Sequence, residues 1–197
     1  MAILAQACPS RAEKPMHFQT TRLHLRPIEA ADEALYVRLY ADPAVMHHIA
    51  EPLTAAAAAR AFKATLRQAR QNPAPLQAWI LSERAAAADI GLLALARPHA
   101  AAGTAELGTI LHGAGQGRGL AAEAQEAVLD QEFSSGRLQL AWSRHAPANR
   151  AAAGLMLKMG FARTDAAGAE RRWQMTSERW RARNRISGGV AHADADR

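Results

Sequence analysis

A glycine-rich stretch at residues 113–121 carries the clearest chemical signal in this sequence. It reads Gly-Ala-Gly-Gln-Gly-Arg-Gly-Leu-Ala and joins a short apolar run to a segment with helical periodicity. Glycines let the main chain turn tightly and let a ligand approach bare amides, and a helix start adds unpaired N–H donors and a positive dipole end. The stretch therefore predicts a site for a phosphate or pyrophosphate, with a purely structural turn as the alternative.

Two well-known nucleotide-binding motifs do not fit this stretch. No Gly-Lys-Ser/Thr follows it, which excludes a Walker loop. A dinucleotide fingerprint needs its glycines in the first strand–helix unit and an acidic residue at the end of the second strand. Here five expected elements precede the strand that leads into the glycines, and the next expected strand, 138–142, is followed by Ser143 and Arg144.

Hydrophobic periodicity predicts the elements that must position the glycine-rich stretch. Seven strands are expected, at 20–27, 76–82, 90–97, 105–112, 138–142, 161–164 and 172–176. Four helices are expected, at 28–40, 54–71, 120–133 and 149–159. This order predicts a single α/β (α+β) domain with a mixed sheet.

The two ends of the chain lack such periodicity. Residues 1–17 contain Pro9 and Pro15 and are expected to form a loose arm. Residues 183–197 include the pair Gly188 and Gly189 and are expected to form a disordered tail. The folded domain is therefore expected to span residues 18–182.

Composition restricts the class of protein. The chain has 197 residues and one cysteine, Cys8, which excludes a disulfide framework and a zinc site built from several thiolates. No apolar run approaches the ~18 residues that a membrane-spanning helix needs. We therefore expect a cytoplasmic protein with no membrane partner and no metal.

The net charge of +6 is unevenly distributed. Seven arginines lie between residues 163 and 185, against Asp165, Glu170 and Glu178. Such a patch could bind nucleic acid or another phosphate-rich ligand, and a solvated charged end of the chain is the alternative. No aromatic-rich or helix-turn-helix pattern accompanies the charge, so a nucleic-acid partner is not expected.

A second motif, after the strand at 138–142, resembles the GNAT acyltransferases when taken with the glycine-rich stretch. The coenzyme loop of that family, Gln/Arg-x-x-Gly-x-Gly/Ala, is matched by Gln116, Gly119 and Ala121. The family also has an Asn after the next strand and a helix that ends in Lys-x-Gly-Phe, matched by Asn149, Lys158, Gly160 and Phe161.

Three shorter segments resemble one branch of this family, the acetyltransferases of ribosomal-protein N-terminal (alanine) α-amines. They are Thr21-Arg-Leu-His-Leu-Arg-Pro27, Asp42-Pro-Ala-Val-Met46 and Ala105-Glu-Leu-Gly108. The whole resemblance covers residues 20–180.

The resemblance implies a GNAT-like domain with a mixed, mostly antiparallel central sheet flanked by helices. Its two central parallel strands, here 105–112 and 138–142, would be splayed to admit acetyl-coenzyme A. The implied coenzyme-binding residues are Leu107, Gly108, Thr109, Ile110, Gln116, Gly117, Arg118, Gly119, Leu120, Ala121, Asn149 and Lys158. For Asn149, an N-cap of its own helix is the alternative role.

Acetyl transfer to an amine requires a neutral nucleophile, a donor for the developing oxyanion and a proton for the leaving thiolate. The resemblance points to Glu106 as the base, with a structural salt bridge as the alternative, and to a main-chain N–H within 107–110 for the oxyanion. Relatives often carry the proton donor as Tyr or Ser at positions that are Met156 and Ala152 here. His145 is the candidate replacement, and the alternatives are Ser143, water or unassisted departure of the thiolate.

The acceptor is expected to be a primary amine. An α-amine with a pKa of about 8 is already about 10% neutral at pH 7, whereas a lysine with a pKa of about 10.4 is almost fully protonated. A single modest base therefore favours a protein N-terminal α-amine over lysine. The isoelectric point of about 10.4 argues against polyamine acceptors.

The substrate side is expected between residues 45 and 53, where His47 and His48 lie, and at Trp142 of the central strands. Two adjacent histidines also raise the question of a metal site, but sequence neighbours rarely point the same way, so cleft-lining residues are expected. Trp142 has core packing as its alternative role.

Two other functions stay open: a catalytically degenerate acyl-coenzyme A-binding or regulatory module, and an acetyltransferase for a small-molecule amine. The chain is expected to act as a monomer or homodimer.

Overall fold

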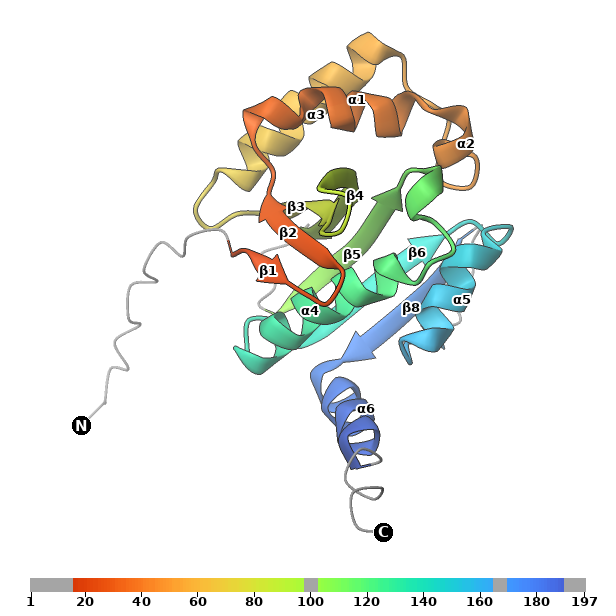
Figure 1. Cartoon of the computed structure of the whole chain (residues 1–197). Coiled ribbons are helices and arrows are strands. Elements are labelled where there is room, and N and C mark those ends of the chain that lie inside the picture. The colour runs from red at the N-terminus through yellow and green to blue at the C-terminus, as the bar shows by residue number, and fades with distance from the viewer. Residues whose placement is uncertain (1–15, 98–102, 165–169, 190–197) are drawn as a thin grey trace, which may run out of the picture.

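Eight strands form one sheet in the computed structural model, which describes residues 16–97, 103–164 and 170–189 (Figure 1). The strand order is β1-β2-β3-β4-β5-β6-β8-β7, and every neighbouring pair is antiparallel except β5–β6. The strands are β1 (Phe18–Gln19), β2 (Leu23–Pro27), β3 (Leu76–Glu83), β4 (Ala88–Ala96), β5 (Thr104–Leu111), β6 (Leu140–His145), β7 (Ala162–Thr164) and β8 (Arg171–Thr176). The expected mixed, mostly antiparallel sheet is confirmed.

Helices cover both faces of this sheet. They are α1 (Glu33–Ala41), α2 (Pro43–Met46), α3 (Ala55–Ala69), α4 (Leu120–Ser134), α5 (Arg150–Lys158) and α6 (Ser177–Gly189). Two short 3-10 turns, η1 (Ala30–Asp32) and η2 (Gly113–Gly115), precede α1 and α4.

The first face carries α1 and α3, which lie side by side in Figure 1. Alanines give α3 its helix propensity, and Thr54 caps its start by accepting a hydrogen bond from the main-chain N–H of Ala57 at 3.2 Å. Buried residues recur at four-residue spacing on α3, at Ala58, Phe62 and Leu66. This stripe packs with α1 against β3 and β4 to form the smaller hydrophobic core.

The second face carries α4, α5 and α6 over the larger core. Apolar residues on one side of α4, including Leu120, Ala124 and Val128, are fully buried against the strands. Trp180 brings α6 into the same core, and its indole N–H donates to Asp130 of α4 at 2.7 Å.

The structure extends the chain's regular elements beyond those expected from the sequence. The short elements β1 and α2 were not expected, and α6 continues to Gly189, past Arg183, where the tail was expected to begin. Trp180 explains the helix, because its burial supplies the apolar contact that periodicity alone did not reveal. Residues 1–15 and 190–197, most of the expected arm and tail, lie outside the described residues.

Part of the basic segment at 163–185 is used within the fold. Arg183 forms an ion pair with Glu126 of α4, and Arg179 donates to the main-chain carbonyl of Gly160 at 2.6 Å. These arginines therefore attach α6 to the domain instead of forming a free patch. Within the described residues, no helix is long and apolar enough to cross a membrane.

Candidate active site

The two parallel strands β5 and β6 separate soon after they begin. Their register contains three pairs, Thr104 with Leu140, Ala105 with Ala141, and Glu106 with Trp142. Beyond Glu106, β5 continues to pair with β4 while β6 continues to pair with β8. The sheet is therefore split at its centre, as expected for the splayed strands, and the split begins at Glu106 and Trp142.

The split exposes main-chain groups on β5. The N–H of His112 donates to the carbonyl of Ile90 at 3.0 Å, so the alternating ladder bonds of β5 direct the even-numbered residues toward β4. The carbonyl of Leu107 and both the amide and the carbonyl of Thr109 therefore face the split, whereas the amide of Leu107 belongs to the last β5–β6 register pair. The carbonyl of Leu111 faces it too and is satisfied by Nε2 of Gln116 at 2.8 Å.

Open space at Gly108 and a polar atom of Gln125 lie close to these main-chain groups of β5. A Cβ added at Gly108, which pairs with Ala94 of β4, would meet nothing within 4 Å. Gln125 of α4 donates to the Thr109 hydroxyl at 3.0 Å, and its Oε1 is buried with no hydrogen-bond partner among the described residues. The split thus has open space beside Gly108 and, at Gln125, unused hydrogen-bonding capacity.

The glycine-rich stretch leads from this split to the start of α4. Gly117 and Gly119 have φ values of +71° and +77°, a conformation that favours glycine over residues with a Cβ. Gly119 is the N-cap of α4, and no side chain caps the helix there. The first amides of α4 therefore remain available for an anion.

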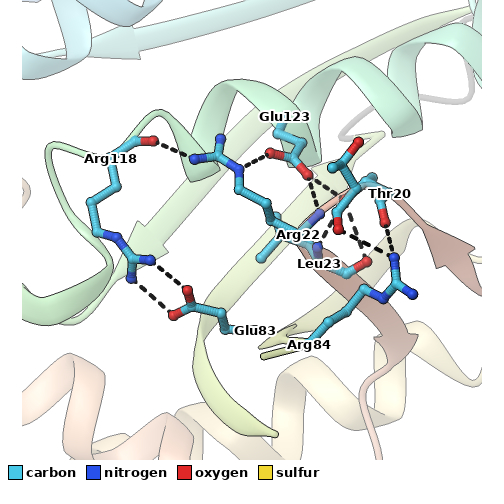
Figure 2. Close-up of polar contacts among 8 residues, drawn as sticks. Thr20, Arg22, Leu23, Glu83, Arg84, Arg118 and Glu123 are labelled. Carbon is cyan, nitrogen blue, oxygen red and sulfur yellow. Dashed lines mark hydrogen bonds and ion pairs between the residues drawn. The ribbon is translucent and has the colours of Figure 1, made fainter. Parts of the chain in front are cut away.

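Arg22 of the N-terminal segment braces this loop (Figure 2). Its NH1 donates to the carbonyl of Arg118 at 2.9 Å, and its Nε donates to Glu123, in the first turn of α4, at 2.6 Å. Glu123 also accepts from the main-chain N–H of Arg22 at 2.8 Å and from the Thr20 hydroxyl at 2.5 Å. Burial by itself raises the pKa of Glu123, but the hydrogen bonds from Thr20 and Arg22 bring it below its ordinary value, so this carboxylate is ionised at neutral pH.

Two cations converge on the N-cap of α4. A Cβ added at Gly119 would lie 3.7 Å from NH2 of Arg22 and 3.7 Å from Nζ of Lys158. Lys158 was expected at this site, whereas nothing in the sequence pattern indicated Arg22. No local signal could have found it, because Arg22 is 101 residues from Glu123 and meets α4 only after folding.

Arg118, in contrast, directs its side chain away from the helix start. Its guanidinium forms a two-pronged ion pair with Glu83 of β3, which raises the pKa of Arg118 and lowers that of Glu83 (Figure 2). Arg118 is one of the implied coenzyme-binding residues, but the contacts of its side chain give no support to a role in binding phosphate. Its main-chain amide still belongs to the loop.

Glu106 lies at the point where the strands part. Oε1 of the half-buried Glu106 accepts a hydrogen bond from Nε of Arg144 at 3.0 Å, and NH1 of Arg144 donates to Glu170 at 3.1 Å. The hydrogen bond to Glu106 is the largest of the effects that raise the pKa of Arg144. Glu106 is thus in a salt bridge, the structural alternative, at a position that also suits a base.

His145 is buried and both of its ring nitrogens are engaged. Trp173 Nε1–H donates to His145 Nε2 at 2.8 Å, so Nε2 carries no proton. The proton therefore resides on Nδ1, which donates to the carbonyl of Ala146 at 2.8 Å. In this arrangement neither nitrogen can deliver a proton to a thiolate, so the contacts of His145 do not support the expected catalytic role.

Asn149 and Trp142 are two further residues that were expected at the site. Asn149 caps α5 by accepting from the N–H of Ala152 at 2.9 Å, which is the alternative role given for it. Trp142 lies beside Glu106, its partner in the β5–β6 register.

His47 and His48 are exposed, with ring centroids 4.3 Å apart, and neither forms a hydrogen bond or ion pair with the described residues around Glu106. No group of three or more His, Cys, Asp or Glu side chains within the described ranges could hold a metal ion.

Comparison with known proteins identifies a family. The model of the acetyltransferase (GNAT) domain matches residues 22–162. No curated protein sequence matches the chain.

Solved structures share the fold at low sequence identity. An acetyltransferase from Agrobacterium tumefaciens superposes with a TM-score of 0.69 at 23% identity, covering 86% of this chain and 99% of its own. A spermidine N-acetyltransferase from Vibrio cholerae, in complex with CoA and spermine, has a TM-score of 0.69 at 19% identity over 82% of this chain and 99% of its own. RimL, a ribosomal L7/L12 α-N-protein acetyltransferase in complex with coenzyme A, has a TM-score of 0.69 at 11% identity over 81% and 97%.

Proposed function

This chain belongs to the GNAT acetyltransferase family, and we propose that it transfers the acetyl group of acetyl-coenzyme A to a primary amine, with a protein N-terminal α-amine as the favoured acceptor. The observation that carries the proposal is the split between β5 and β6, which leads from Glu106 to the uncapped start of α4. A narrow slot with an anion site at its mouth is what a long thioester with a diphosphate requires.

The residues of the slot fit that co-substrate. The amides of residues 116–121 would bind the diphosphate, and Arg22 and Lys158 would supply the positive charge near Gly119. The main-chain groups of Leu107 and Thr109 would pair with the amides of the pantetheine arm. Coenzyme A contributes the activated thioester, and the residues of this chain bind and orient it.

The chemistry next to the slot is direct attack by the amine. The amine nitrogen forms a bond to the thioester carbonyl carbon, and the carbon–sulfur bond breaks. Glu106, directly or through water, accepts the proton that the amine loses. The main-chain N–H of Thr109 would donate to the carbonyl oxygen as it gains charge.

The thiolate that leaves takes its proton from water. Met156 and Ala152 cannot donate a proton, and both nitrogens of His145 are occupied. A thiol with a pKa of about 8.5 is a tolerable leaving group without an acid at neutral pH. The absence of a proton donor at these three positions also favours the second candidate, a module that binds acyl-coenzyme A without catalysis. Release of free thiol in the presence of amines separates the two functions.

Gly119→Glu tests the placement of the diphosphate. The substitution puts a negative side chain between the helix amides and the two cations, so we expect acetyl-coenzyme A affinity to fall at least tenfold by calorimetry. Gly136→Glu is the matched control, because Gly136 follows the other end of the same helix with a φ of +74° and open space around it. Equal affinities of the wild type and a folded Gly119→Glu protein would contradict the placement.

A further inference from the structure

A face that carries two arginines lies beside Glu106 on β6 and β8, which are neighbours in Figure 1. Ala141 and Trp173 point into the core under α4 and α5. The residues that alternate with them, Trp142, Arg144 and Arg172, therefore point to the opposite face, the same face as Glu106. The centroid of the half-buried Trp142 ring lies 6.0 Å from the guanidinium carbon of Arg144 and 5.9 Å from that of Arg172.

The charges on this face are paired unevenly. Arg144 and Arg172 are register partners on adjacent strands, an arrangement that is destabilising for like charges. Both carboxylates of this face, Glu106 and Glu170, contact Arg144. Arg172 is exposed and has no carboxylate partner among the described residues, so its guanidinium remains available to a ligand.

The guanidinium of Arg172 lies close to the proposed base and therefore close to the path of the acceptor. Arg144 hydrogen-bonds the proposed base, Glu106, and the guanidinium groups of Arg144 and Arg172 both lie within about 6 Å of the Trp142 ring centroid. An amine that approaches Glu106 along this face therefore passes a planar cation held against an aromatic ring. Such a pair favours carboxylates and other planar anions and repels polycations.

We infer that Trp142 and Arg172 form an anion subsite for the acceptor, so that the acceptor is an amine carrying a carboxylate close by, as in a peptide N-terminus with an acidic second residue. This inference rests on the proposed function, because it places the acceptor amine at Glu106. It excludes polyamines as good acceptors of this enzyme. The subsite sets specificity and takes no part in the bond-forming step.

The test compares hexapeptides amidated at the C-terminus that begin Ala-Glu, Ala-Gln or Ala-Lys. Thiol release should give kcat/KM values in the order Glu, Gln, Lys, with Glu over Gln by about fivefold, the size of one partly exposed ion pair. Arg172→Gln should remove the preference for Glu over Gln by lowering kcat/KM for the Ala-Glu peptide about fivefold. Arg163→Gln is the control, because Arg163 is exposed on β7 opposite Trp173 and should retain the preference.

Calorimetry of the same peptides on the coenzyme A-saturated protein separates the inference from the proposed function. If the wild type binds the Ala-Glu peptide selectively and Arg172→Gln abolishes that selectivity, the subsite is supported, even if no thiol is released. If no thiol is released, the proposed acetyl transfer is wrong. Equal binding and equal turnover of the three peptides, or an equal effect of Arg172→Gln on all of them, overturns the subsite while acetyl transfer itself stands.

Discussion

At the scale of single residues, Glu106 has the surroundings that a base for amine deprotonation needs. It lies where β5 and β6 part, and Arg144 contacts only one of its two carboxylate oxygens. The second oxygen is left for a proton from the acceptor or from a bridging water. The ion pair with Arg144 thus orients the carboxylate without using all of its capacity to accept hydrogen bonds.

Glu106→Gln should lower the rate most at low pH. An α-amine with a pKa of about 8 is about 1% neutral at pH 6 and about 90% neutral at pH 9, so the need for a base disappears as pH rises through that pKa. We expect a loss of about a hundredfold at pH 6 that shrinks steadily toward pH 9. The measurement is kcat/KM for a peptide acceptor across this range.

Glu170→Gln is the control for this prediction. Glu170 shares Arg144 with Glu106 but lies outside the split, so its removal leaves Glu106 and its ion pair in place. A Glu106→Gln enzyme with the same rate as wild type from pH 6 to pH 9 would remove Glu106 from the mechanism.

At the scale of elements, the coenzyme loop depends on a strand far from it in sequence. Arg22, just before β2, contacts both Arg118 in the loop and Glu123 in the first turn of α4. The lowered pKa of Glu123 means that its stabilising contribution is complete above the unfolded carboxyl pKa of about 4.3 and is lost only as pH falls through the lower folded value. The brace between β2 and α4 therefore holds throughout the neutral range.

Arg22→Ala should raise the KM for acetyl-coenzyme A about tenfold, because charged hydrogen bonds are worth about 1.5–3 kcal/mol. The kcat should stay within about twofold of the wild type, because these hydrogen bonds act on the loop and not on the reacting atoms. S-acetylpantetheine, which has no diphosphate, should show no change. Arg22→Lys should not restore the KM, since an ammonium cannot span both partners.

Arg84→Ala is the matched control for the brace. Arg84 donates to the carbonyls of Thr20 and Thr21 at 2.9 and 3.2 Å in the same region but does not contact the loop (Figure 2). If Arg22→Ala weakens acetyl-coenzyme A and S-acetylpantetheine equally, Arg22 supports the fold in general and the assigned role is wrong.

At the scale of the whole molecule, α6 completes the large core. Trp180 is 2% exposed, packs near Phe133 and is tied to Asp130, while Asn184 donates to the same Asp130 at 3.0 Å. All of these contacts lie in the C-terminal half of α4, away from the coenzyme loop. Through these contacts the helix contributes to the stability of the domain.

Trp180→Ala should lower the free energy of unfolding by about 3 kcal/mol, the lower end of the cost of truncating a buried aromatic residue. Urea denaturation measures this, and acetyl-coenzyme A affinity of the folded variant should not change. Leu157→Ala, at a residue that is 65% exposed, should cost less than about 0.5 kcal/mol. A loss for Trp180→Ala no larger than that of Leu157→Ala would mean that α6 does not belong to the cooperative unit.

Local patterns in the sequence were sufficient to predict most of the strands and helices in their order and the glycine-rich loop, and several such motifs together indicated the family. Each pattern is encoded within a short stretch of consecutive residues: alternation for β2, the spacing of Phe62 and Leu66 in α3, and the glycines of 113–119. They could be predicted because periodicity and the conformational freedom of glycine act over short stretches of chain.

Contacts between distant segments were decided only by the tertiary structure. The hydrogen bonds of Arg22 to Arg118 and Glu123, the approach of Arg22 and Lys158 to Gly119, and the hydrogen bond from Trp173 to His145 are such contacts. Each depends on which long side chains meet once the sheet has twisted and the helices have packed. No periodic pattern encodes these contacts, because their energies arise from pairs of groups that are up to about a hundred residues apart in the sequence.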